Sequence, residues 1–312
     1  MKAVGIMKHG GPEALEILEV DKVDAGPGQI RVKNFAAAVN PVDVSVRNGS
    51  MAEMQKIKPP PYVPGMDAAG IIDQIGEGVE TDLKEGDSVM AMVVPNGNHG
   101  AYREQIVLDQ NAVVRAPKDS SHIQASTLPM NSLTARLSLD LLDLQKDQVL
   151  AVTGAPGAYG GYVVQLAKAD GLIVIADSND NDRALLESLG VDIIVPRGES
   201  FADNIRKEFP EGVDGIADGA LLNEQAIAAV KDGGSFTSVR GFKGEPQRDI
   251  NFTATWVTAY DCKKDILEKL KLQAEEEIIS LRVNQAVSMD KASLAHETLE
   301  AGGSRGRMVI EF

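Results

Sequence analysis

Hydrophobic and polar positions alternate in short runs over the first 122 residues, and glycine or proline separates most of these runs. Such alternation over about four to eight residues, bounded by turn residues, is typical of β-strands. The pattern therefore predicts an irregular, mostly β domain. The expected strands are residues 15–20, 29–39, 69–75, 88–94 and 104–108.

After about residue 121 the pattern changes, because apolar runs of strand length alternate with helical segments. Helices are expected over residues 124–142, 160–169, 183–189, 201–209 and 223–230. Strands are expected over residues 149–153, 172–176, 193–195, 215–217 and 235–239. This alternation indicates βαβ units, and hence an α/β domain with a parallel, doubly wound sheet.

The end of the chain carries a charged helix, expected over residues 261–277, and an apolar strand, expected over residues 307–312. No other predicted strand lies near this last strand, so we expect it to pair with the sheet of the first domain. The 312 residues then divide into a domain of residues 1–122 and 258–312 and a domain of residues 123–257. This agrees with a typical domain size of about 150 residues.

Charge and cysteine content exclude several classes of function. The 31 basic and 46 acidic residues give a net charge of −15, which repels phosphate backbones, so we expect no nucleic-acid partner. The single cysteine, Cys262, excludes an internal disulfide framework and fits a cytoplasmic location. Residues 149–167 are uncharged, but glycines and a proline interrupt them, so we expect no membrane span.

This uncharged segment holds the most informative motif. A strand leads into the spacing G-x-x-G-x-x-G, and a helix follows. Glycines let a backbone approach a pyrophosphate closely, and the helix N-terminus offers it N–H groups. The alternative is a glycine turn that only packs helix against strand. The predicted cofactor-binding residues of the turn are Gly154, Ala155, Gly157, Ala158, Tyr159 and Gly160.

The choice of cofactor depends on the charges after the next strand. Asp177 stands where an acidic residue can hydrogen-bond the adenosine ribose. Together with Asp180 and Asp182 it would repel a 2′-phosphate, which favours NADH. Arg183 and Arg197 are near enough in sequence to bind that phosphate, so NADPH stays open. We therefore expect NAD(P)H, with a slight preference for NADH.

Further motifs are spread over almost the whole chain. They are Asn-Pro-Val-Asp at 40–43, Pro-Gly-Met-Asp-Ala-Ala-Gly at 64–70, Ile-Gly-Glu-Gly-Val at 75–79, Gly-Asp-Ser-Val at 86–89, Leu-Thr-Ala at 133–135 and Arg-Gly-Arg-Met-Val-Ile at 305–310. With the glycine turn, they resemble the medium-chain dehydrogenase/reductase superfamily, specifically its zinc-free quinone oxidoreductase branch. The resemblance implies a GroES-like, mostly β catalytic domain, a Rossmann domain and a homodimer joined through the nucleotide domains.

The same resemblance bears on zinc. In the alcohol dehydrogenase branch a cysteine and a Gly-His-Glu element hold the metal, whereas the corresponding positions here read Asn40 and Gly65-Met66-Asp67. The histidines are His9, His99, His122 and His296. They have no metal-ligand spacing, and we expect all four on the surface or in loops. We therefore expect no metal site.

Without a Lewis acid, a quinone or an α,β-unsaturated carbonyl is an easier hydride acceptor than a simple ketone. The resemblance implies that Asn40 and Thr134 are catalytic residues that border the nicotinamide and the acceptor. It also implies that Val239, Arg240 and Gly241 flank the nicotinamide amide and bind the cofactor.

The residues by themselves leave structural alternatives open. Asn40 can be a polar turn residue before Pro41, and Thr134 can be a helix hydroxyl bonded to its own backbone. Asp43 is expected to hold its loop rather than to transfer protons, with Arg47 as a partner.

The leading prediction is a zinc-independent NAD(P)H-dependent reductase that transfers a hydride to a quinone or an α,β-unsaturated carbonyl. One alternative is a simple enal reductase or alcohol dehydrogenase. Another is a non-catalytic NAD(P)H-binding dimer with a structural or redox-sensing role. Ser45 and Met51 motivate the last alternative, because several quinone reductases of the family carry tyrosines in this region.

Overall fold

The computed structural model describes residues 1–52, 58–198 and 200–312 and forms two compact units. Unit 1 comprises Met1–Met130, Tyr260–Glu276 and Leu281–Phe312, and unit 2 comprises Asn131–Ala259 and Glu277–Ser280. The sequence analysis had placed residues 277–280 in the first domain, whereas the structure places them in unit 2.

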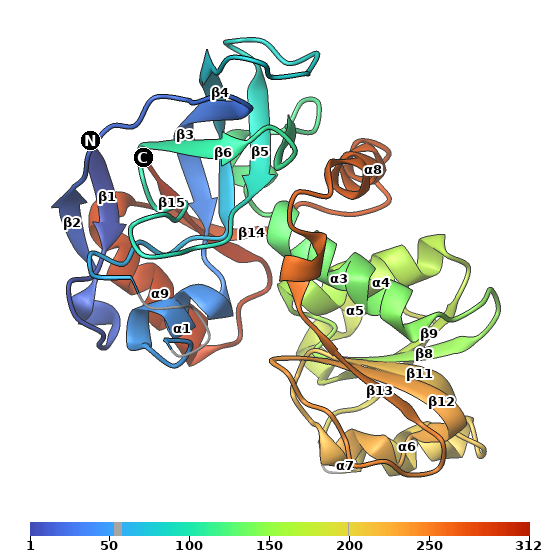
Figure 1. Cartoon of the computed structure of the whole chain (residues 1–312). Helices are drawn as coiled ribbons and strands as arrows, with labels where there is room; N and C mark the ends of the chain where they lie inside the picture. The colour runs from blue at the N-terminus through green and yellow to red at the C-terminus, as the bar shows by residue number, and fades with distance from the viewer. Residues whose placement is uncertain (53–57, 199) are drawn as a thin grey trace. The chain divides into compact units, whose positions relative to one another are not determined.

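Unit 1 is built on a sheet in the order β14-β15-β3-β4-β5-β7, and β6 pairs with β3 (Figure 1). The strands of this sheet are β3 (Gln29–Ala38), β4 (Asp67–Ile75), β5 (Ser88–Met92), β6 (Gln105–Asp109), β7 (Val113–Arg115), β14 (Val283–Ser288) and β15 (Arg307–Glu311). A separate antiparallel pair joins β1 (Lys2–Gly5) to β2 (Glu16–Glu19). The helices are α1 (Pro41–Asn48), α2 (His122–Ala125), α8 (Lys264–Glu275) and α9 (Ala292–Ala301).

The last strand confirms an expectation of the sequence. β15 pairs antiparallel with β3, with Val309 opposite Ala38 and Ile310 opposite Ala37. All four of these residues are completely buried. Burial of both strands in the core of unit 1 explains why the chain end returns to the first domain.

Unit 2 has a six-stranded parallel sheet in the order β10-β9-β8-β11-β12-β13. Its strands are β8 (Val149–Thr153), β9 (Ile173–Ser178), β10 (Ile193–Pro196), β11 (Val213–Asp218), β12 (Val230–Val239) and β13 (Asn251–Thr255). Its helices are α3 (Pro129–Leu142), which begins in unit 1, α4 (Ala158–Ala169), α5 (Arg183–Ser188), α6 (Phe201–Glu208) and α7 (Glu224–Ile227). Helices α3, α4 and α5 cover one face of the sheet and α6 and α7 cover the other (Figure 1), so the doubly wound prediction is confirmed.

Two predicted helices differ from the sequence expectation. The helix predicted over residues 124–142 is two helices, since α2 ends at Ala125 and α3 begins at Pro129. Proline has no N–H and disfavours a helical residue before it, so it starts a helix rather than continuing one. The helix predicted over residues 223–230 stops at Ile227, because Val230 already pairs with Val213 at the start of β12.

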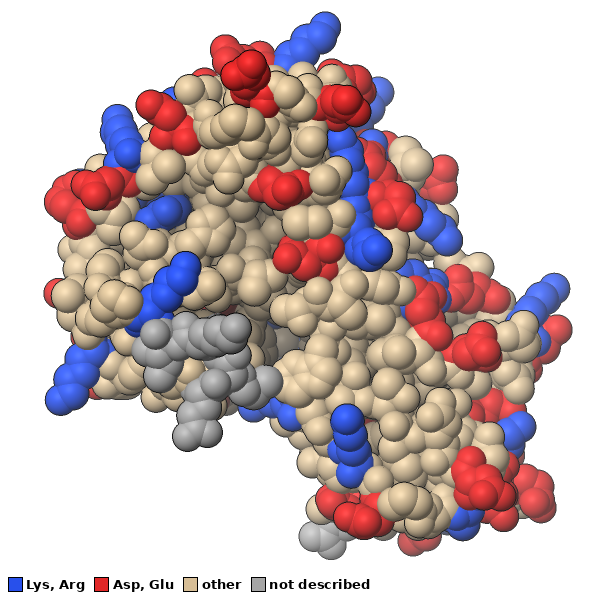
Figure 2. Space-filling view, viewed as in Figure 1, with Lys and Arg blue, Asp and Glu red and all other residues tan. Residues whose placement is uncertain are grey.

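The surface combines both signs of charge. On the face shown in Figure 2, acidic and basic side chains are interspersed among uncharged residues. Among the described residues, no helix is long and apolar enough to cross a bilayer.

Candidate functional site

Unit 2 forms the glycine turn between β8 and α4. Gly154 follows β8 with a φ of 66°, which lies in the left-handed region that favours glycine. A Cβ on Gly160 would lie 2.4 Å from the carbonyl oxygen of Gly154 and 2.7 Å from the Cα atom of Ala155. Gly157 is the N-cap of α4, and a glycine there lets a phosphate approach the positive end of the helix dipole. The local geometry therefore suits a dinucleotide pyrophosphate.

Tyr159, which is also part of the motif, is hydrogen-bonded to another side chain of unit 2. Its hydroxyl lies 2.7 Å from Oγ of Ser138, and Ser138 Oγ lies 3.0 Å from Oγ1 of Thr255. Burial raises the pKa of Tyr159 well above its ordinary value, so the phenol stays neutral. This hydrogen bond fixes the first turn of α4 against α3.

Asp177 and Arg197, which the sequence suggested as rivals in cofactor choice, form one ion pair. Nε of Arg197 donates to Oδ2 of Asp177 at 2.7 Å, and the backbone N–H of Gly154 donates to Oδ1 at 3.3 Å. The carboxylate is buried, whereas 40% of the Arg197 side chain is exposed. A negative and a positive group thus lie together beside the glycine turn. Arg183 instead lies on the surface and faces Glu187 at 3.9 Å.

The third predicted cofactor segment follows β12. β12 ends at Val239, and Arg240 and Gly241 adopt positive φ angles of 66° and 85°. A Cβ on Gly241 would lie 2.7 Å from Cζ2 of Trp256, so the indole packs on this turn. Because β8, β9, β11 and β12 run parallel, their carboxyl ends meet at one edge of the sheet. The fold therefore brings the three predicted cofactor segments to the same edge.

Sequence reasoning missed the loop that follows β11 at this edge. The buried carboxylate of Asp218 accepts hydrogen bonds from Thr153 Oγ1 at 2.5 Å and from two backbone N–H groups of the loop. A Cβ on Gly154 would lie 3.2 Å from the backbone nitrogen of Ala220, so the loop abuts the glycine turn. The sequence did carry a signal for Asp218, because it is an acidic residue at the end of an apolar run, as Asp177 is.

Thr134 lies on α3 within unit 2. Its side chain is buried, and its backbone carbonyl accepts a hydrogen bond from Ser138 Oγ at 3.0 Å. Thr134 thus lies one helical turn from the cluster of hydroxyl groups formed by Ser138, Tyr159 and Thr255.

Unit 1 contains a buried polar centre. We use this name for Asn40, Asp43, Arg47, Asp67, Tyr102, His296 and Arg307, which are buried, together with Glu300 at its exposed edge. Asn40 is completely buried and is the N-cap of α1. Its Nδ2 donates to Oδ2 of Asp67 at 2.7 Å and to the carbonyl of Ala38 at 3.2 Å, and its Oδ1 accepts a hydrogen bond from Arg307. The amide group therefore has protein partners at both ends.

The two aspartates have different tasks in the polar centre. Asp43 accepts hydrogen bonds from the backbone of Asn40 and Gly65, at 2.8 and 2.9 Å, and from the hydroxyl of Tyr102 at 3.1 Å. Asp67 accepts one from the backbone N–H of Met130 at 2.7 Å. Burial raises the pKa of Asp43 to about 7 and that of Asp67 to about 6. The expected loop-holding contacts of Asp43 are thus present.

The expectation for the histidines is wrong for His296, which is completely buried on α9. Its ring nitrogens lie 3.3 Å from Nη1 of Arg47 and 3.2 Å from the hydroxyl of Tyr102. Burial lowers the pKa of His296 to about 3, so the ring is neutral. Arg47 forms its ion pair with Glu300, at 2.8 and 3.0 Å, instead of with the expected Asp43. The sequence pattern did not predict how α9 packs within unit 1.

The donor set around Asn40 does not fit a catalytic zinc. Zinc sites use thiolate, imidazole and carboxylate ligands, whereas this region offers the Asn40 amide, the Met66 thioether and an Asp67 carboxylate with hydrogen-bond partners of its own. Among the described residues, no group of three or more His, Cys, Asp or Glu side chains could hold a metal ion.

Comparison with known proteins supplies the wider context. Residues 26–118 match the family model "Alcohol dehydrogenase GroES-like domain", and residues 158–267 match the model "Zinc-binding dehydrogenase". A 2-methylene-furan-3-one reductase of Solanum lycopersicum is 30% identical, over 99% of this chain and 79% of its own length. A quinone oxidoreductase of Sus scrofa is 28% identical, over 99% of this chain and 97% of its own length. The crystal structure of an NAD-dependent alcohol dehydrogenase superposes with a TM-score of 0.88 at 26% identity and covers 100% of both chains.

Proposed function

Because the chain belongs to the quinone oxidoreductase-like branch of the medium-chain dehydrogenase/reductase superfamily, it is an NAD(P)H-dependent oxidoreductase, and we propose that it reduces quinones or α,β-unsaturated carbonyls without zinc. The observation that carries the proposal is the backbone contact of Gly160 with Gly154. Any side chain at position 160 would meet the turn at 2.4 Å, whereas glycine leaves the turn free to bind a pyrophosphate.

The residues at the carboxyl edge of the unit 2 sheet divide the task of cofactor binding. The glycine turn and the N-terminus of α4 would bind the pyrophosphate, and Asp177 would hydrogen-bond the adenosine ribose. Residues 239–241 would flank the nicotinamide amide. Bound NAD(P)H supplies a hydride for the conjugated carbon of the acceptor.

The predicted catalytic residues have unequal roles in this proposal. Asn40 donates to Ala38 and Asp67, so it acts as a positioning residue that fixes the start of α1. Thr134 remains the residue proposed to border the acceptor.

Zinc independence rests on the poor ligand set of Asn40, Met66 and Asp67. Elemental analysis of the purified protein should find well under one zinc per chain, and stoichiometric zinc would contradict this part.

We assign a preference for NADH to the buried carboxylate of Asp177. A ribose hydroxyl can donate to it, whereas a 2′-phosphate would be repelled. Asp177→Ala should weaken NADH binding about tenfold and improve NADPH binding, because Arg197 loses its carboxylate partner and can turn to the phosphate. Arg197→Ala is the matched control, expected to weaken only NADPH. If the ratio of NADH affinity to NADPH affinity stays the same in both variants, Asp177 and Arg197 do not determine the choice of cofactor.

The decisive test is oxidation of NADH and NADPH in parallel, with benzoquinone, naphthoquinone and a simple enone as acceptors. Turnover is expected with at least one of these acceptors. Saturable cofactor binding without turnover on the whole panel would instead favour a non-catalytic nucleotide-binding dimer.

We further propose a cytoplasmic homodimer joined through unit 2. β13 is one of the two edge strands of the six-stranded sheet, and an exposed edge can pair with a second copy. Trp256 follows β13 and is 40% exposed, which suits an interface. Light scattering should give twice the mass of 33.2 kDa, and a monomer at all concentrations would contradict the proposal.

A further inference from the structure

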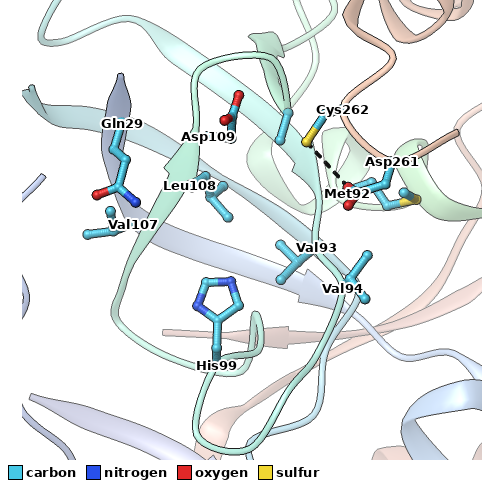
Figure 3. Close-up of a pocket in the computed structure, with 11 residues that line it drawn as sticks. Gln29, Met92, Val93, Val94, His99, Val107, Leu108, Asp109, Asp261 and Cys262 are labelled. Carbon is cyan, nitrogen blue, oxygen red and sulfur yellow. Dashed lines mark hydrogen bonds between the residues drawn. The ribbon is translucent and has the colours of Figure 1, made fainter. Parts of the chain in front are cut away.

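Unit 1 contains a cavity of about 240 Å³ apart from the polar centre. The start of β3, the end of β5 with the loop after it, strand β6 and the segment before α8 line it, and it is partly open to solvent beside the exposed Cys262 (Figure 3). Met92, Val93, Val94, Val107, Leu108 and Ala112 form its apolar walls, and a polar lining of similar extent comes from Gln29, His99, Asp109, Asp261 and Cys262. Since a cavity of about 150 Å³ holds benzene, a volume of about 240 Å³ suits a molecule with one ring, and the mixed lining calls for polar groups on that ring.

One end of the cavity carries His99. The turn that presents it is fixed, because Val63 N donates to the carbonyl of Gly97 at 2.9 Å and Arg103 Nη2 donates to that of Asn98 at 2.8 Å. Among the described residues, the imidazole has no hydrogen-bond partner. Burial and the nearby cations Arg103 and Lys58 lower the pKa of His99 to about 4. The ring is therefore neutral and can donate one hydrogen bond to a ligand in a region of positive potential.

The opposite end has the reverse polarity, as Figure 3 shows for Cys262 and Asp261. The Cys262 thiol donates to Oδ1 of Asp261 at 3.5 Å, and Asp109 also lines this end. Burial and these two carboxylates raise the pKa of Cys262 to about 11. Carboxylates only accept hydrogen bonds, so a ligand must bring a donor here. No Lys or Arg is among the described residues that line the cavity.

We propose that this cavity binds a small, uncharged single-ring compound with a carbonyl acceptor at the His99 end and a hydroxyl donor at the Asp109–Asp261 end, that is, a hydroxyaryl ketone or a close relative. The apolar walls receive the ring. The two carboxylates repel an anionic ligand. A ligand that carries no hydrogen-bond donor cannot bond to either of them. The proposal does not rest on the reductase function.

The single cysteine of the chain gives a direct readout, because every thiol signal reports on this cavity. The rate of alkylation of Cys262 is measured at fixed pH with 4-hydroxyacetophenone, acetophenone, phenol and 4-hydroxybenzoate as probes. Saturable protection is expected from 4-hydroxyacetophenone, about tenfold when its concentration is about ten times Kd. Acetophenone and phenol, which each lack one group, should bind about three- to tenfold more weakly. The anionic probe gains at the His99 end but is repelled by the two carboxylates and by the net charge of −15, so it should protect less than 4-hydroxyacetophenone.

Variants separate this cavity from the cofactor site. His99→Ala and Asp261→Asn should each weaken 4-hydroxyacetophenone about three- to tenfold, while Asp21→Asn, an exposed control in the same unit, should not. Protection should persist in Gly160→Ala and in the presence of saturating NADPH. Equal protection by all four probes, no protection by any, or loss of protection with NADPH would overturn the proposal. None of these results depends on turnover, so failure here leaves the reductase proposal intact.

Discussion

The glycine turn of unit 2 and the polar centre of unit 1 position their groups in opposite ways. The turn consists of backbone atoms from one short stretch, in which Gly160 packs on Gly154. In the polar centre, side chains meet from distant parts of the chain. Asn40 contacts Asp67, 27 residues away, and Arg307, 267 residues away. The glycine turn is formed by backbone atoms that are close in sequence, whereas the polar centre depends on the complete fold of unit 1.

This difference predicts different responses to mutation. Changes in the turn should reduce cofactor binding more than stability, since they alter the shape of a surface that binds a ligand. Changes in the polar centre should reduce stability first, because a buried polar group without its partner is costly.

The largest effect is expected for Arg307→Met. This substitution removes the donor to Asn40 Oδ1 and the positive charge that lowers the pKa of Asp67. Loss of one partner of a buried charged cluster costs about 3–5 kcal/mol in the free energy of unfolding. Denaturant unfolding measures the change, and Lys8→Met at an exposed position is the control, expected below about 0.5 kcal/mol. A cost near that of the control would show that the polar centre does not stabilise unit 1.

The second prediction concerns pH and has no counterpart in the glycine turn. Asp43 and Asp67 have folded-state pKa values of about 7 and 6, above their ordinary value of 3.8. These two groups make the folded state bind more protons than the unfolded state between pH 4 and 7, so their contribution to stability is largest at the acidic end and falls as pH rises. The lowered pKa values of His296 and His99 contribute in the opposite sense below about pH 6.5. Each carboxyl group contributes a loss of about 1.4 kcal/mol per pH unit over the range in which only the folded state holds its proton.

Asp43→Asn tests the origin of this slope. Asparagine does not titrate, so the variant lacks the contribution of Asp43, and its stability should fall less steeply, or rise more steeply, with pH between pH 4 and 7 than that of the unaltered protein. Unfolding curves at several pH values measure both proteins. An identical slope in the variant would exclude Asp43 as a source of the pH dependence.

The two sites also differ in how far the sequence predicts them. The turn and the return of β15 to unit 1 follow from local spacing and from an apolar run without neighbours. The wrong assignments at Arg47 and His296 have another cause. Their partners come from α9, with 253 residues between Arg47 and Glu300, and no local pattern encodes such a pairing. Asp177 and Arg197 were both identified, but only the fold shows that they bind each other.

The third prediction addresses the glycine turn. Gly160→Ala places a Cβ 2.4 Å from the Gly154 oxygen, so the turn must move and NAD(P)H affinity should fall about tenfold or more. Fluorescence titration measures the affinity, and thermal unfolding should show a smaller loss than for Arg307→Met. Gly26→Ala in unit 1 is the control, since its Cβ would meet only the side chain of Gln29, at 3.1 Å, and the affinity should stay unchanged. Unchanged affinity in folded Gly160→Ala would contradict the proposed pyrophosphate site.

The smallest effect is expected for Tyr102→Phe, which removes one hydroxyl from the polar centre without changing its shape. That hydroxyl links Asp43 at 3.1 Å to His296 at 3.2 Å, so its loss should cost about 1 kcal/mol in the free energy of unfolding. Tyr62→Phe is the matched control, because among the described residues the Tyr62 hydroxyl has no hydrogen-bond partner. A cost equal to that of the control would mean that the carboxylate and the imidazole do not depend on the bridging hydroxyl. The larger costs of the polar centre would then arise from Arg307 and Asn40 alone.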